Sequence, residues 1–152
     1  MTVKLANYTT EISAAKSVLQ IQQLLQEHGA KSILIEYDKM VPVALAFVIP
    51  TRHGNLPFRL PVKIQNVNVV LKRMKTRNSY NPNQEEIDYR KAQNVTWRNI
   101  YYWLRSQLAL IEIDQVTIDQ VFLPYLRQNG EKCLYEVMIE RQFLLEKGQG
   151  DK

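Results

Sequence analysis

The fold is decided by a stretch of thirty residues, SILIEYDKMVPVALAFVIPTRHGNLPFRLP, which occupies positions 32–61. Over 32–38 and 41–50 every second residue is strongly apolar, which is the period of a β-strand with one buried face. The alternation resumes over 56–60 after a short turn, and connections of this length join antiparallel strands. We therefore expect a three-stranded antiparallel meander. Pro57 and Pro61 lack amide donors, so the third strand is expected either to lie at an edge of the sheet or to end early.

Helices are expected on both sides of this meander. Before it, apolar residues at helical spacing predict a helix over 14–28, with Gly29 as its C-terminal cap. After it, Pro61 suits the first turn of a second helix, which we expect to end near Arg77. A turn-rich loop over 78–83 then leads to acidic residues that favour the start of a third helix.

The third helix is predicted to be the longest. Its expected buried face consists of Trp97, Ile100, Tyr101, Leu104, Leu108 and Ile111. Thr117 and Gln120 form the pattern of a capping box for a short helical stretch through Leu123, and 131–145 is expected to be the last helix. The sequence thus predicts one α+β domain over 1–147, with helix, three-stranded antiparallel meander and three or four further helices, and a flexible tail at 148–152.

The composition is that of a globular domain and argues against a membrane-spanning, secreted or disulfide-bonded protein. The 152 residues are 45% apolar and 23% charged, which fits one globular domain. The single cysteine, Cys133, excludes an intramolecular disulfide. The longest apolar stretch, 41–50, is too short for a membrane helix, and the first ten residues lack the apolar core of a secretory signal. We therefore expect a cytoplasmic protein.

Positive charge is concentrated in the middle of the chain. The formal net charge is +5, and residues 39–84 contain eight basic residues and no acidic one. Four of the eight, Lys72, Arg73, Lys75 and Arg77, lie near the end of the second predicted helix. Phosphate groups are the natural partners of such a cluster. A second interpretation is a solvated helix end, because cations there also complement the helix dipole.

The long helix carries a second pattern. Arg98, Tyr102 and Arg105 recur at i, i+4 and i+7, approximately opposite the buried face, with Trp103 at its edge. Guanidinium groups and aromatic rings together can stack a base and bind its phosphate. The alternative is packing against the last helix or a second subunit, through an apolar stripe made of Val95, Tyr102, Ala109 and Ile113.

Catalytic motifs are nearly absent. The sequence contains no glycine-rich phosphate loop and no G-x-S-x-G elbow, and His28 and His53 lack zinc-ligand spacing. Glu36 and Asp38 share one face at the end of the first strand. A carboxylate pair in this arrangement has the chemistry needed for Mg²⁺ binding or for acid–base catalysis. We expect a protein that is not an enzyme, with no metal and no cofactor.

The chain also resembles a group of small phage and prophage proteins along almost its full length. The resemblance rests on LANYTT at 5–10, EYD at 36–38, FRLP at 58–61, WR at 97–98, WL at 103–104 and FLPY at 122–125. It implies an origin in a mobile element and assigns no functional residue. The helix, three strands, helix order is similar to that of double-stranded RNA binding domains, but their lysine cluster at the second helix is replaced by Lys63 alone.

These patterns lead to three functional hypotheses. The first is a phage-type protein that binds a phosphate-bearing ligand. The ligand is either a nucleic acid along the basic surface or a signalling nucleotide sequestered from host defence, in a pocket at a subunit interface where Arg59, Arg98 and Trp103 converge. The second is a regulatory factor that binds a host protein, or its own copies, through the long helix. An enzyme using Glu36 and Asp38 is the third. The predicted ligand-binding residues are Arg52, Arg59, Lys63, Lys72, Arg73, Lys75, Arg77, Arg98, Tyr102, Trp103 and Arg105.

Overall fold

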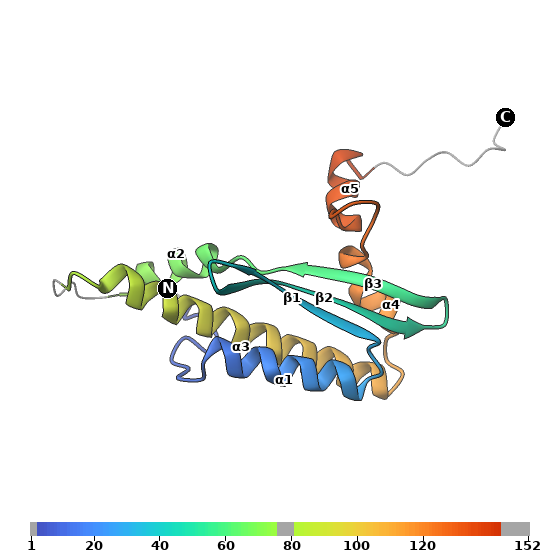
Figure 1. The fold of residues 1–152 in the computed structure, drawn as a ribbon, viewed down its shortest axis with the longest axis horizontal. Helices are drawn as coiled ribbons and strands as arrows, with labels where there is room; N and C mark the ends of the chain where they lie inside the picture. The colour runs from blue at the N-terminus through green and yellow to red at the C-terminus, as the bar shows by residue number, and fades with distance from the viewer. Residues whose placement is uncertain (1–2, 76–80, 144–152) are drawn as a thin grey trace.

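The computed structural model describes residues 3–75 and 81–143 and has the predicted α+β architecture (Figure 1). A helix precedes a three-stranded antiparallel sheet, and the remaining helices follow it. In chain order the elements are α1 (Ala14–Glu27), β1 (Ser32–Asp38), β2 (Val41–Thr51), β3 (Gly54–Pro61), α2 (Ile64–Met74), α3 (Gln84–Glu112), α4 (Ile118–Phe122), the 3₁₀ helix η1 (Leu123–Tyr125) and α5 (Leu134–Glu140).

The sheet has the order β1-β2-β3, so the middle strand holds it together as expected. Its register sets Leu45 opposite both Ile35 and Leu60. The proline-containing strand β3 lies at an edge, where the backbone N–H of Arg127 donates to the carbonyl of Pro57 at 2.9 Å. A later segment of the chain therefore partly covers this edge of the sheet.

The core lies between one face of the sheet and the helices α1 and α3, which run side by side beneath it in Figure 1. The predicted buried face of the long helix is confirmed, since Trp97, Leu104 and Leu108 are almost fully buried. The Trp97 indole N–H donates to the backbone carbonyl of Pro42 at 3.0 Å and so fixes α3 against β2. Burying an indole is favourable only when its N–H finds such an acceptor.

The C-terminal part is joined to the sheet by aromatic packing. Phe122 of α4 contacts the rings of Phe47 and Phe58 with centroid distances of 5.4 and 5.7 Å. The predicted capping box of Thr117 and Gln120 is confirmed at the start of α4. Beyond η1 the chain forms α5, which projects from the rest of the molecule (Figure 1).

Two predicted helix boundaries are wrong. Helix α2 ends at Met74, since the backbone of Lys75 is already extended. Arg77 and the predicted tail at 148–152 lie outside the described residues. The last helix covers Leu134–Glu140 rather than 131–145. Its start is delayed because Arg127 and Cys133 form a β-bridge around a turn at Gly130, and it ends early because the backbone after Arg141 adopts positive φ.

Candidate functional site: a basic pocket between the N-terminal loop and the end of α2

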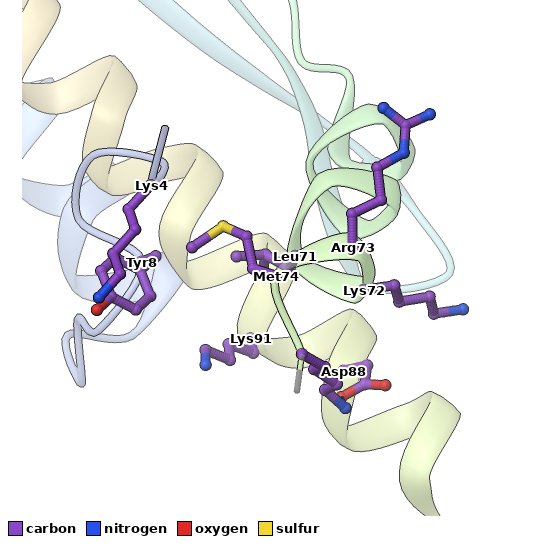
Figure 2. A pocket seen from close by; sticks show the side chains of 9 residues that line it. Lys4, Tyr8, Leu71, Lys72, Arg73, Met74, Asp88 and Lys91 are labelled. Atoms are coloured by element: carbon purple, nitrogen blue, oxygen red, sulfur yellow. The ribbon is translucent and has the colours of Figure 1, made fainter. Parts of the chain in front are cut away.

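The three described cations of the predicted cluster, Lys72, Arg73 and Lys75, line one pocket at the end of α2. Its volume is about 470 Å³. The N-terminal loop forms the other side of the pocket, and α3 contributes to it as well (Figure 2). The complete lining of this basic pocket is Lys4, Tyr8, Leu71, Lys72, Arg73, Met74, Lys75, Asp88 and Lys91.

The floor of the basic pocket is apolar. Leu71 is buried in the core, and Met74 extends from α2 toward the N-terminal loop in Figure 2. Tyr8 lies on that loop, with the Lys4 ammonium 5.6 Å from the centre of its ring. Because Leu71 points inward, the helical period turns the next two residues, Lys72 and Arg73, outward to the rim.

Among the described residues, one of the five basic side chains that line the pocket forms an ion pair with a carboxylate, and the other four do not. Lys75 Nζ donates to the Asp88 carboxylate at 2.5 Å. The other four basic residues form no ion pair with any carboxylate in the described part of the chain. These are Lys4, Lys72, Arg73 and Lys91. All four are exposed, so their charge is available to an anion in solution.

Asp88 organises this end of α2. Its side chain is buried and also accepts a hydrogen bond from the Gln84 amide at 2.8 Å. Burial opposes ionisation of Asp88, but the hydrogen bonds from Lys75 and Gln84 and the positive charges of Lys75 and Lys72 outweigh burial. Together they hold the pKa of this carboxyl below its ordinary value of 3.8. The Lys75–Asp88 pair therefore ties the residue that follows α2 to α3 at neutral pH.

Arg98 is not on the face where the sequence pattern put it. Its side chain is only 6% exposed, and Nη1 donates to Ser17 Oγ at 3.3 Å and to Gln20 Oε1 at 2.5 Å, both on α1. Its guanidinium also stacks on Tyr101 and Tyr102, at 4.3 and 4.8 Å from the ring centres. Arg98, flanked by these two tyrosine rings, therefore holds α3 against α1, and within the chain it does not converge with Arg59, which pairs with Glu36.

The predicted oligomer stripe is also interrupted. Val95 is fully buried inside the chain, so it cannot lie on an exposed contact surface. Tyr102, Ala109 and Ile113 are exposed. The expectation of one continuous stripe fails because α3 packs against α1 as well as against the sheet.

The remaining predicted cations are dispersed. Arg52 lies exposed in the β2–β3 turn, and Arg105 is exposed on α3. Arg59 Nε donates to Glu36 Oε2 at 2.8 Å across the uncovered face of the sheet. This ion pair also engages one member of the carboxylate pair considered for catalysis, and the strand register shifts directly after Glu36.

Lys63 and Trp103 line a second hollow of about 770 Å³, which we call the aromatic groove. It lies between the start of α2, the middle of α3 and the segment from η1 to α5. Tyr125 and Tyr135 provide further aromatic side chains. Trp103 is half-buried and packs edge-on against Phe122 and Tyr125, which fixes the orientation of its ring.

Sequence reasoning missed six residues of the basic pocket: Lys4, Tyr8, Leu71, Met74, Asp88 and Lys91. Lys4 and Tyr8 lie more than fifty residues before α2, and no local pattern links them to it. Asp88 did leave a signal, because it precedes Ala92 and Val95 on the same helical face. A carboxylate on an otherwise apolar face needs a partner, and Lys75 is that partner.

Comparison with known proteins gives no relative: no family model, no curated protein and no solved structure matches the chain. Across 3–75 and 81–143, no group of three or more histidine, cysteine, aspartate or glutamate side chains is arranged to hold a metal ion. Within the same residues, no helix has the length and hydropathy needed to cross a membrane.

Proposed function

We propose that the protein binds a phosphate-bearing ligand, a nucleic acid or a nucleotide, in the basic pocket. The observation that carries the proposal is the convergence of four cations, from three separate parts of the chain, around one hollow; none of the four pairs with a carboxylate of residues 3–75 or 81–143. A dipole-compensating helix end needs only Lys72 and Arg73, so it does not account for Lys4 on the N-terminal loop or Lys91 on α3.

The composition of the pocket favours a nucleotide unit over a bare inorganic anion. Its floor offers the Met74 thioether and the Tyr8 ring, which suit the flat, apolar face of a base. Its rim offers ammonium and guanidinium groups, which suit phosphate oxygens. Nucleotide and nucleic acid share this chemistry and are distinguished by experiment.

The direct test is equilibrium binding followed by fluorescence anisotropy, with a labelled twenty-nucleotide oligothymidine and a labelled nucleoside triphosphate as separate probes. We expect Lys72→Gln/Arg73→Gln to weaken binding of whichever probe binds. The matched control is Lys16→Gln/Lys31→Gln, which removes the same charge from exposed residues outside the pocket. The proposal is wrong if neither probe binds, or if the two double variants lose affinity equally.

The nature of the natural ligand is tested by what accompanies the protein from cells. The protein is purified at low salt and then denatured, and any small molecules are separated from nucleic acid. Mass spectrometry and ultraviolet absorbance then show whether a stoichiometric nucleotide or heterogeneous nucleic acid was bound. The former favours sequestration of a signalling nucleotide, and the latter favours a nucleic-acid binder. The mobile-element origin, the role against host defence and the cytoplasmic location stay predictions from the sequence.

A further inference from the structure

We infer that the ligand is a single-stranded nucleic acid, whose backbone lies in the basic pocket and whose neighbouring bases enter the aromatic groove. This inference rests on the proposed function and names its ligand. It starts from the arrangement of two hollows that the sequence did not connect. One is lined by Lys72, Arg73 and Met74 at the end of α2, and the other by Lys63 and Asn66 at its start.

Both hollows lie along the same pair of helices. On α3, Asp88 and Lys91 line the basic pocket, whereas Thr96 and Trp103 line the aromatic groove. Helices α2 and α3 therefore pack with opposite directions, and the two hollows follow one another along them. At 1.5 Å per helical residue, Lys91 and Trp103 lie about 18 Å apart along α3. That span equals about five steps of a stacked strand at 3.4 Å per nucleotide.

The two hollows differ in chemistry in the way a single strand requires. The basic pocket supplies unpaired cations for phosphates. The aromatic groove supplies Trp103, Tyr125 and Tyr135, with Lys63 as an exposed cation at its α2 side. Proteins that bind single strands combine a basic track with aromatic rings on which exposed bases stack.

A duplex fits this arrangement poorly. Its bases are already stacked and paired, so they cannot reach the faces of Trp103 or Tyr135 without first being unstacked. A mononucleotide is too short to span both hollows. A single strand can place phosphates and bases in them at the same time.

Tryptophan fluorescence tests base stacking directly. The chain has two tryptophans; Trp97 is fully buried and bonded to Pro42, whereas Trp103 lines the groove. We expect oligothymidine to quench the emission of Trp103. An abasic strand of equal length, which keeps the phosphates and lacks the bases, should bind more weakly by at least about fivefold and should not quench. A Trp103→Phe variant should lose the quenching.

The variant that separates the aromatic groove from the basic pocket is Tyr135→Ala. Tyr135 is 50% exposed, so its truncation leaves the core intact. We expect this variant to bind oligothymidine at least about fivefold more weakly and the abasic strand unchanged. The matched control is Tyr37→Ala, which truncates a tyrosine on β1 that is 62% exposed and should leave both affinities unchanged.

The outcomes distinguish this inference from the proposed function. If abasic and normal strands bind equally well, and Lys72→Gln/Arg73→Gln still weakens both, the proposed function stands and base stacking is refuted. Duplex binding as tight as single-strand binding, or binding of the nucleoside triphosphate alone, also overturns the inference. If no probe binds, both fail.

Discussion

The salt dependence of binding follows quantitatively from the four cations of the basic pocket that pair with no carboxylate in the described part of the chain. Each cation that neutralises a phosphate of a single strand releases counterions and contributes about −0.7 to the slope of log K against log salt. Lys4, Lys72, Arg73 and Lys91 together therefore predict a slope of about −2.8. Between about 50 and 200 mM salt, the affinity for oligothymidine should fall about 50-fold.

Removing two of the four charges should halve this dependence. For Lys72→Gln/Arg73→Gln we expect a slope of about −1.4, so that the same change in salt weakens binding only about sevenfold. Lys75 is left out of the count because Asp88 neutralises it. The assay is fluorescence anisotropy at four or more salt concentrations with one labelled oligothymidine.

The control variant Lys16→Gln/Lys31→Gln should keep the slope of the unmodified protein, since neither residue lines the pocket. Equal slopes for all three proteins would refute the assignment of phosphate contacts to α2. A slope near zero for the unmodified protein would refute electrostatic binding altogether.

Further predictions concern the residues around this site. Asp88→Asn removes the buried carboxylate, so it should lower the free energy of unfolding by about 1–3 kcal/mol. The same variant should steepen the salt slope by about 0.7, because Lys75 loses its ion-pair partner and becomes available to phosphate. The pKa of Asp88 is lowered in the folded protein, so its stabilising contribution is present above about pH 4 and is lost as the pH falls further. Urea unfolding from pH 6 to pH 2 should therefore show a smaller loss of stability for Asp88→Asn than for the native protein, because Asp119, whose pKa is also lowered, still titrates in both. Arg98→Leu should lower the melting temperature and leave oligonucleotide affinity unchanged, because its partners lie on α1; a selective loss of affinity would contradict its structural role. Lys39→Asn/Met40→Gly should raise the melting temperature, because both residues have positive φ, of 47° and 69°, in the β1–β2 turn; an unchanged or lower value would contradict this.

The sheet and the major helices could be predicted because their signals are local. Alternation over 32–61 and helical spacing over 14–28 depend only on neighbouring residues, and the edge position of the third strand was argued from Pro57 and Pro61 within it. The start of α5 was missed because it depends on a β-bridge between Arg127 and Cys133, and its end was missed because it depends on the positive φ of the backbone after Arg141.

Part of the basic pocket could also be predicted, because some of its residues are neighbours in the sequence. Lys72, Arg73 and Lys75 are neighbours in sequence, whereas Lys4 and Lys91 meet them only through the packing of the N-terminal loop and α3. Arg98 was misplaced because the sequence pattern named the last helix or a second subunit, and not α1, as the packing partner of its face of α3. That helix packs against α1, α2 and the sheet, so side chains on several of its faces are buried.

The central claim is that an anionic ligand lies in the basic pocket, and chemical-shift mapping tests its location most directly. In amide spectra of the labelled protein titrated with oligothymidine, we expect the largest shifts at Tyr8, in the last turn of α2 and around Lys91. The Lys16→Gln/Lys31→Gln protein should show the same map, and Lys72→Gln/Arg73→Gln should need more ligand to reach it. Shifts centred instead on Arg52 in the β2–β3 turn, or on Arg105 of α3, would contradict the account.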